Sequence, residues 1–191
     1  MQTFDLNYNP RIYSASKIWH NLRWRELRDK YGFDITARWI NVECGTYENP
    51  TGAKQLTPPE KRQLWIECAH DVRVADFTAI YGESRDEQRG GTVEFGMTLG
   101  YGNPIYVIGD CPFFGANSHS DAAYMHHPLV HRVHTQKFAD GSYDYLTGYR
   151  EAVKHYLMTY HTPERVFAKT GFLNANSSRS NYGLQQRAIA D

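Results

Sequence analysis

The feature that most constrains the fold is an unbroken apolar run, Pro-Ile-Tyr-Val-Ile-Gly, at positions 104–109. A short run without polar alternation is typical of a β-strand that is covered on both faces. Such strands occur mainly in parallel sheets, because the crossover connections of a parallel sheet place helices on its faces. The run therefore favours an α/β protein with a parallel sheet.

The rest of the chain alternates between strand-like and helix-like patterns. Further strands are predicted at 11–16, 33–39, 75–81 and 130–135, and helices at 17–30, 57–72, 92–101 and 143–160. The second helix has the clearest start, since Thr57 suits the N-cap, Pro58 the first helical position and Glu60 the capping box. This order predicts a single flavodoxin-like or Rossmann-like domain, with a parallel sheet of about five strands and helices on both faces.

Length and charge narrow the class of protein. A chain of 191 residues suits one domain with a proper hydrophobic core. Its 21 Lys and Arg balance its 21 Asp and Glu, so no net field would draw it to nucleic acid or to an anionic membrane. No run approaches the ~18 apolar residues that span a bilayer, and the three cysteines form no C-x-x-C pair. We expect a cytoplasmic α/β domain over residues 1–161, followed by a tail at 162–191 that is disordered or docks on a partner subunit.

Glu94 is the candidate active-site residue, because it follows Gly90-Gly91-Thr92 and Val93 at the predicted start of a helix. In open parallel sheets ligands bind outside the carboxyl ends of the strands, and this loop is expected at that edge. The two glycines let the backbone approach a ligand, Thr92 is a good N-cap, and the first turn favours an ionised carboxylate. Such a carboxylate can act as a nucleophile at a sugar carbon.

A simpler explanation is that Glu94 only complements the helix dipole, which is worth about 0.3–1 kcal/mol. On spacing alone this explanation is the better one, since G-G-x-x-E is a common pattern. The catalytic explanation gains from Tyr13 in the first strand and from Asp76 at the start of the third. Both are expected to converge with Glu94 on the same edge of the sheet.

Four segments of the chain form a more specific pattern. They are I-Y-S-A-S at 12–16, W-x5-D-x4-D at Trp65, Asp71 and Asp76, G-x-V-E-F-G-x-x-L-x-x-G-x-P at 91–104, and I-Y-V-I-G at 105–109. Through these segments the chain resembles, over about residues 10–160, the nucleoside 2-deoxyribosyltransferase family. The superfamily also contains 2-deoxynucleoside 5-monophosphate N-glycosidases. The motifs A-S-K-x-x-H at 15–20 and H-H-P-L-V at 126–130, together with the predicted strand that contains Trp39, resemble a phage-type subgroup.

The resemblance implies that Glu94 attacks C1 of a deoxyribosyl group and forms a glycosyl-enzyme intermediate. It also implies that Tyr13 orients this carboxylate, and that Asp76 holds the base and assists protonation of its leaving nitrogen. Water or a second base would complete the reaction without a cofactor, and active sites shared between subunits imply a homodimer or larger assembly. The residues expected to contact the small-molecule nucleoside or nucleotide are Ser14, Lys17, Trp39, Gln88, Gly90, Gly91, Thr92 and His127.

Position 88 departs from the family pattern. Six residues before the nucleophile the transferases have an acidic ligand and the monophosphate glycosidases a small hydroxyl residue, whereas this chain has Gln88. Transfer, hydrolysis and a requirement for a 5-phosphate therefore stay open. Arg85, Arg89 and Lys17 could bind phosphate, or the two arginines could belong to a solvated mixture of charges in an acidic loop. A non-catalytic nucleotide-binding module on the same scaffold is a further alternative.

Neither the histidines nor the tryptophans define a site by themselves. The histidines at 126–134 lie in a predicted loop and strand and lack zinc-ligand spacing, so no metal site is predicted. His126 or His127 at the edge of a pocket is one alternative, and partly exposed structural histidines are the simpler one. Trp39 is the best candidate to stack on a base, although a core position is slightly favoured, and Trp65 is expected to face inward.

Overall fold

The computed structural model of the protein describes residues 8–43, 56–87, 89–110 and 123–161. The described residues divide into two units, of which 8–153 belong to the first and 154–161 to the second. The first unit contains the entire sheet. The predicted tail at 162–191 lies outside the described residues, so a domain boundary after residue 161 stays a prediction.

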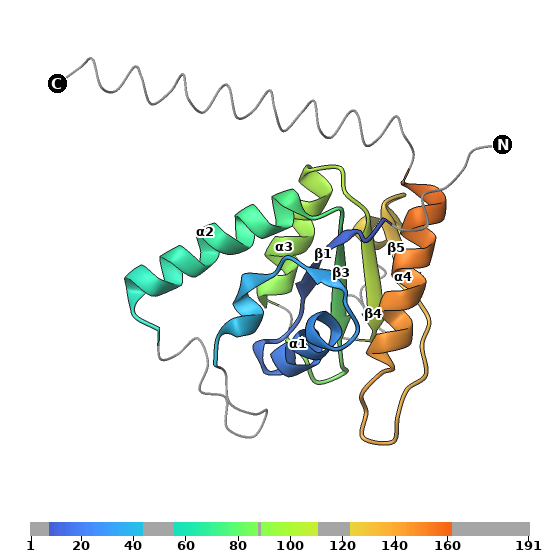
Figure 1. The fold of residues 1–191 in the computed structure, drawn as a ribbon, viewed down its shortest axis with the longest axis horizontal. Helices are drawn as coiled ribbons and strands as arrows, with labels where there is room; N and C mark the ends of the chain where they lie inside the picture. Colours follow the sequence, from blue (N-terminus) through green and yellow to red (C-terminus); the bar gives the residue numbers. More distant parts are fainter. Residues whose placement is uncertain (1–7, 44–55, 88, 111–122, 162–191) are drawn as a thin grey trace, which may run out of the picture. The chain divides into compact units, whose positions relative to one another are not determined.

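Five parallel strands form the centre of the first unit (Figure 1). They are β1 (Arg11–Ala15), β2 (Asp34–Ile35), β3 (Phe77–Gly82), β4 (Ile105–Gly109) and β5 (Val130–Val133). Their order is β2-β1-β3-β4-β5, and each neighbouring pair is parallel. This is the flavodoxin-like order of a doubly wound sheet, so the predicted fold class is confirmed. The order reverses between β1 and β3, and the carboxyl ends of these two strands therefore mark the switch point at which such folds bind ligands.

Helices cover both faces of this sheet (Figure 1). The helical elements are η1 (Ile18–His20), α1 (Asn21–Asp29), η2 (Arg38–Asn41), α2 (Pro58–Val74), α3 (Arg89–Gly100), η4 (Ala123–His126) and α4 (Tyr145–Thr159). Successive residues of a strand point to opposite faces. Tyr13 reaches Glu94 on α3, whereas the next residue, Ser14, bonds to Tyr149 on α4. The strand β1 is thus covered by α3 on one face and by α4 on the other.

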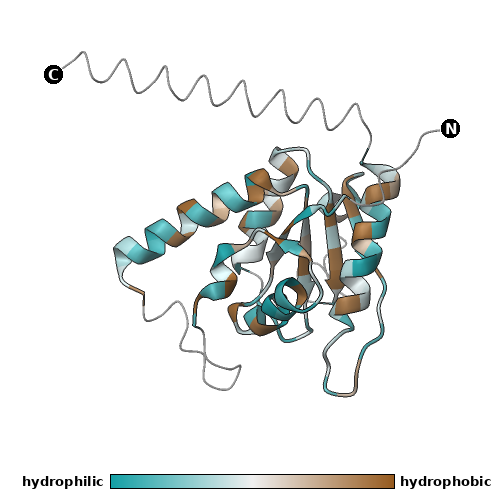
Figure 2. Cartoon of the chain, in the orientation of Figure 1, coloured by the Kyte–Doolittle hydropathy of each residue, from teal (hydrophilic) through white to brown (hydrophobic). Residues whose placement is uncertain are grey.

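The inner strands account for the apolar run in the sequence. All six residues of β3 are buried, as are four of the five residues of β4. Hydrophobic colouring is accordingly concentrated on β4 at the centre of the unit (Figure 2). Aromatic rings fill the α1 and α4 side of the sheet: the rings of Trp24 and Tyr149 stack 5.4 Å apart, and Trp24 meets Tyr81 of β3 edge-on at 5.3 Å. Contacts of this kind stabilise a core beyond the burial of their apolar area.

The helix α2 begins as predicted, but one residue of its predicted inward face points outward. Thr57 and Glu60 form a reciprocal capping box ahead of its first turn. The predicted inward orientation of Trp65 is wrong, because its side chain is 45% exposed. The helix buries Cys68 and Asp71 instead, and the carboxylate of Asp71 accepts hydrogen bonds from the backbone N–H and the guanidinium of a neighbouring arginine in η2. Asp71 is therefore part of the framework.

The predicted strand at 33–39 is much shorter in the structure. Only Asp34–Ile35 pair with β1, and the chain then turns into η2. The turn carries Trp39 into the core, where its indole N–H donates to the carbonyl oxygen of Ser14 at 2.9 Å. A buried indole N–H needs such a partner. The hydrogen bond of Trp39 therefore favours the turn into η2 over continuation of the strand that the alternating sequence pattern predicted.

Gly109 and Gly102 provide a matched test of how closely β3 and β4 approach. Both have a positive φ, of 85° and 70° respectively. A Cβ at Gly109 would collide with the carbonyl oxygen of Gly82 on β3, whereas a Cβ at Gly102 would meet nothing within 4 Å. We expect Gly102→Ala to lower the free energy of unfolding by about 1 kcal/mol, through backbone strain alone. Gly109→Ala should lower it by about 2–4 kcal/mol, because overpacking adds to the strain.

Urea unfolding of both variants, followed by circular dichroism, measures this difference. Equal losses in the two variants would contradict the close approach of the two strands at their carboxyl ends.

Candidate active site

Glu94 and Tyr13 meet in the interior of the first unit. The hydroxyl of Tyr13 on β1 donates a hydrogen bond of 2.5 Å to Oε1 of Glu94 on α3. Tyr13 is fully buried, and Glu94 keeps 6% of its surface exposed. Within the described part of the chain, Oε2 of Glu94 accepts no hydrogen bond. One carboxylate oxygen is thus held by the protein, and the other has no partner in this part of the chain.

Helix α3 begins earlier than predicted, and this changes the electrostatics of Glu94. The helix starts at residue 89, so Gly90, Gly91 and Thr92 lie inside its first turn and Glu94 lies in the second. The predicted N-cap at Thr92 is therefore wrong, and the helix dipole, which acts mainly within the first turn, has little effect on the carboxylate. Burial raises the pKa of Glu94 to about 7, and the hydrogen bond from Tyr13 opposes this rise.

The neighbours of Glu94 keep their protons at neutral pH. Burial, assisted by the adjacent Glu94 carboxylate, raises the pKa of Tyr13 well above its ordinary value, so its hydroxyl remains a hydrogen-bond donor. Burial also raises the pKa of the Cys68 thiol on α2 to about 12, and this thiol is therefore not a nucleophile. Of these three groups, only Glu94 titrates near neutrality.

Two threonines fix the depth of Glu94 above the sheet. The hydroxyl of Thr98, one turn along α3, donates to the carbonyl oxygen of Glu94 at 2.8 Å. It also shares a hydrogen bond of 2.7 Å with the hydroxyl of Thr78 on β3. Both threonines are fully buried, so this contact ties the helix to the strand inside a dry core. The carboxylate is consequently held by its own helix as well as by Tyr13.

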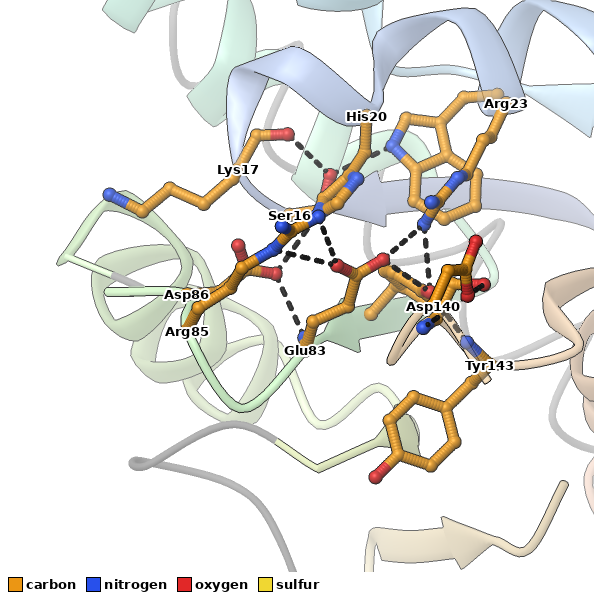
Figure 3. Close-up of polar contacts among 12 residues, drawn as sticks. Ser16, Lys17, His20, Arg23, Glu83, Arg85, Asp86, Asp140 and Tyr143 are labelled. Atoms are coloured by element: carbon orange, nitrogen blue, oxygen red, sulfur yellow. Dashed lines mark hydrogen bonds and ion pairs between the residues drawn. The ribbon is translucent and has the colours of Figure 1, made fainter. Parts of the chain in front are cut away.

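A second polar group lies beyond the carboxyl ends of β1 and β3, at the switch point (Figure 3). Imidazole Nε2 of His20, in the segment after β1, lies 2.9 Å from Oδ2 of Asp86, in the segment after β3. The same oxygen accepts the backbone N–H of Glu83 at 2.8 Å. His20, Glu83 and Asp86 are 3%, 1% and 0% exposed. We name these three residues the rim cluster.

Arginines and a tyrosine hold the rim cluster in place (Figure 3). The guanidinium of Arg23 donates to Glu83 and to the hydroxyl of Tyr81, both at 2.7 Å. Arg85 donates to the other oxygen of Glu83, from Nε at 3.2 Å and from Nη2 at 3.1 Å. The view of this loop as a solvated mixture of charges is therefore wrong for Glu83 and Asp86, which are buried. It does describe residues 87 and 89, whose exposed side chains form a surface ion pair.

The rim cluster was not predicted as part of a site. His20 entered only through a subgroup motif, and Glu83 and Asp86 only as loop charges. The signal that could have found them is their position, because they directly follow the two strands that flank the switch point of this topology.

Ser14 and Trp39, both predicted to contact substrate, belong to the core. The hydroxyl of Ser14 accepts a hydrogen bond from Tyr149 at 2.8 Å and is fully buried on the face opposite Tyr13. The indole N–H of Trp39 is taken by the backbone of Ser14, and its ring is buried. The structure does not bring either side chain to Glu94, because strand alternation and the turn into η2 direct them inward.

Asp76 and His127 lie at the opposite edge of the sheet. Asp76 precedes β3, and its carboxylate accepts hydrogen bonds from the hydroxyl of Tyr8 at 2.6 Å and from the backbone N–H of Arg11 at 2.9 Å. His127 precedes β5 and is exposed. The expected convergence of Asp76 with Glu94 is wrong, because a residue before a parallel strand lies at the amino edge, away from the switch point.

Of the remaining predicted contacts, Lys17 lies on a loop at the switch point. Lys17 follows β1, and its ammonium group lies 5.0 Å from the centre of the Trp19 ring. Lys17 forms no ion pair within the described residues, so it stays a candidate for binding an anionic group. Gln88 lies outside the described residues, and its predicted contact stays a prediction.

The described ranges contain neither a cluster of metal-binding side chains nor a membrane-spanning helix. No group of three or more His, Cys, Asp or Glu side chains in these ranges is placed to hold a metal ion. No helix among them is both long enough and apolar enough to cross a membrane.

Comparisons with known proteins do not assign a family. No protein-family model matches the chain, and no curated protein matches it. Among solved structures, the chain is similar to the CMP N-glycosidase BcmB of Clostridium botulinum, with 13% sequence identity and a TM-score of 0.40. The match covers 64% of this chain and 86% of that chain. A similarity at this level carries no argument about function.

The raised pKa of Glu94 predicts how the stability of the protein depends on pH. When the pKa of a carboxyl group rises on folding, the group contributes most to stability at a pH below its pKa in the unfolded protein. This contribution is lost as the pH rises through its pKa in the folded protein. Between the ordinary value of 4.5 and about 7, wild type should therefore become less stable relative to Glu94→Gln. Above pH 7 we expect the variant to be more stable by up to about 3 kcal/mol, because a neutral amide replaces a buried charge.

Denaturant unfolding of both proteins from pH 4 to pH 9 measures this difference. Glu87→Gln is the matched control, since Glu87 is exposed and its removal should shift the curve by no more than about 0.5 kcal/mol at any pH. Parallel pH curves for wild type and Glu94→Gln would show that Glu94 is not titrating in a buried environment.

Proposed function

We propose that this protein cleaves or transfers the N-glycosidic bond of 2-deoxynucleosides through a covalent ester on Glu94. The observation that carries the proposal is the buried hydrogen bond between Tyr13 and Glu94, which leaves Oε2 without a partner in the described residues. Its position on β1 and α3, next to the switch point of the sheet, supports the proposal. The sequence resemblance in four separate segments supports the choice of a nucleoside as substrate.

In the first step, Oε2 of ionised Glu94 forms a bond to C1 of the sugar while the bond from C1 to the base nitrogen breaks. The electron pair of the broken bond stays on the base, which takes up a proton. A carboxylate next to C1 stabilises the positive charge that develops there. Partial desolvation raises the energy of the Glu94 anion, so the anion gains more by forming the ester than a fully hydrated carboxylate would.

Tyr13 has the geometry of a positioning residue for this step. Its hydroxyl is bound to Oε1, which fixes the plane of the carboxylate and directs Oε2 toward a substrate. The same bond favours the ionised form of Glu94, which is the reactive form. Loss of this hydroxyl would therefore change both the orientation of the nucleophile and the pH at which it ionises.

In the second step, an acceptor attacks C1 and releases the carboxylate of Glu94. With water as acceptor the products are free sugar and free base, and with a second base the product is a new nucleoside. A nucleoside 5-monophosphate is the second candidate substrate. Lys17 favours it, because this residue follows β1 at the switch point and its ammonium group forms no ion pair within the described residues. We further propose that the protein works as a homodimer or larger assembly, as the resemblance implies.

Incubation with deoxynucleosides and their 5-monophosphates, with and without an acceptor base, tests the activity. We expect wild type to release base, and Glu94→Gln to lose several orders of magnitude in kcat/KM, because the covalent route is removed. Mass spectrometry of acid-quenched wild type should also show a deoxyribosyl group on the peptide that contains Glu94. Near-normal turnover by the variant would exclude this chemistry, and ligand binding without any turnover would favour a nucleotide-binding module.

The pH dependence of kcat/KM tests the role assigned to Tyr13. For wild type the rate should rise with pH up to about pH 7 as Glu94 ionises. For Tyr13→Phe this limb should move to higher pH by about one unit, since a hydrogen bond to a charged group is worth about 1.5 kcal/mol or more. Tyr101→Phe is the control, because Tyr101 is an exposed tyrosine beyond the end of α3. An unmoved limb in Tyr13→Phe would refute the role.

A further inference from the structure

The proposed reaction needs a proton for the departing base, and Asp76 does not lie where it could supply one. Its carboxylate is at the amino edge of the sheet, bound to Tyr8 and Arg11. A base leaving as a bare anion is a poor leaving group, so a proton donor contributes typically 10²–10⁴-fold to steps of this kind. Another group, at the carboxyl edge of the sheet, would have to donate this proton to the base.

The rim cluster is at that edge. His20 follows β1 and Asp86 follows β3, so both lie on the loops at the switch point of the sheet. The ring of His20 also packs edge-on against Tyr81, with centroids 5.2 Å apart. Tyr81 belongs to the face of the sheet that α1 covers, whereas Glu94 belongs to the face that α3 covers. His20 and Glu94 therefore belong to opposite faces of the sheet.

This arrangement fits a displacement at a sugar carbon. The nucleophile attacks C1 from the side opposite the departing base, so the proton donor has to lie across the sugar from the carboxylate. A nucleoside bound at the switch point beyond β1 and β3 would, in this arrangement, have Glu94 on one side of C1. On the other side it would have the loops that carry His20 and Asp86.

The hydrogen bonds of His20 leave one ring nitrogen for a ligand. Asp86 binds Nε2, and Nδ1 makes no hydrogen bond within the described residues. A carboxylate on one ring nitrogen fixes the ring orientation and leaves the other nitrogen to give or take a proton. The backbone N–H of His20 donates to the carbonyl oxygen of Lys17, so this loop contact does not involve the imidazole.

Asp86 provides a second, independent indication that a ligand binds here, because one of its carboxylate oxygens lacks a hydrogen-bond partner within the described residues. Its side chain is completely buried, and its Oδ1 has no hydrogen-bond partner within the described residues. An unsatisfied carboxylate oxygen in the interior destabilises a protein by about 1–3 kcal/mol or more, so native structures rarely retain one without a functional reason. The N–H groups of a nucleobase are donors of the kind that this oxygen lacks.

The surrounding contacts hold this pair rigidly. Glu83 donates its backbone N–H to Asp86 and is itself bound by the guanidinium groups of Arg23 and Arg85. The indole N–H of Trp24 donates to the hydroxyl of Ser16 at 2.8 Å, which anchors the loop after β1. A site whose groups are fixed before substrate arrives loses little free energy to reorganisation.

We propose that His20, oriented by Asp86, protonates the departing base in the reaction proposed for Glu94. As the bond from C1 to the base nitrogen breaks, its electron pair takes the proton from Nδ1 of the His20 imidazolium, which becomes neutral imidazole. In the second step the neutral ring takes a proton from the attacking water or from the acceptor base, and its positive charge is restored. This inference rests on the proposed function.

A series of substrates with leaving bases of decreasing basicity tests this role. Suitable series are 2-deoxyuridine with its 5-fluoro, 5-bromo and 5-nitro derivatives, and a matching set of halogenated purine deoxynucleosides. His20→Gln retains an amide group near the position of Nε2 for Asp86 but lacks a group that transfers protons. We expect its kcat/KM to fall by about 10²–10⁴-fold on the most basic leaving group. The loss should shrink steadily along the series, because the best leaving groups need no proton.

The controls separate this role from a structural one. His70→Gln is the matched histidine variant, since His70 also lies beside a carboxylate, that of Asp71, but its side chain is 51% exposed. It should retain wild-type rates on every substrate. Asp86→Asn is the second variant, which should show the same leaving-group dependence as His20→Gln if the latter does not fold. Circular dichroism and thermal unfolding establish that each variant is folded.

The outcomes distinguish the two proposals. A loss in His20→Gln that is equal along the series, or no loss, would overturn the assignment of His20 while the ester on Glu94 stands. Full activity of Glu94→Gln along the series would overturn the proposed function itself. Absence of wild-type turnover on every substrate would overturn both.

Discussion

The hydrogen bond between Tyr13 and Glu94 joins two polar groups that the sheet and its helices remove from water. Neither group is tolerable there alone, because a buried carboxylate or hydroxyl without a partner is strongly destabilising. The bond exists because β1 presents alternate residues to alternate faces, and because the two threonines hold α3 against β3. The position of the carboxylate is thus a consequence of sheet geometry, and the chemistry proposed for it depends on that geometry.

Much of the fold could be predicted from the sequence, for reasons that are local. The apolar strands, the capping box at Thr57 and the order of elements each follow from short-range patterns, and the five-stranded parallel sheet confirms them. The errors arose where long-range contacts override local ones. Trp39 leaves the strand pattern to bond with Ser14, and Trp65 points outward because Cys68 and Asp71 occupy the inward face of α2.

The candidate site was predictable only in part. Glu94 and Tyr13 were identified from a motif and a resemblance, and the structure places them in contact. Asp76 was misplaced although it was predicted at the start of the third strand, because the starts of parallel strands lie at the amino edge of the sheet, as the register of β3 against β1 shows. The rim cluster was missed because charge in a loop suggests solvation, and burial of Glu83 and Asp86 depends on partners distant in sequence.

The shortness of β2 has a consequence for how these molecules meet one another. An edge strand exposes a row of unpaired backbone N–H and C=O groups, and a long, flat row can recruit a strand from another chain. At its β2 side this sheet ends in a pairing of just Asp34 and Ile35 before the chain turns away into η2. The burial of Trp39 that causes this turn thereby also shortens the template that intermolecular strand pairing would need, which protects this side of the sheet against aggregation.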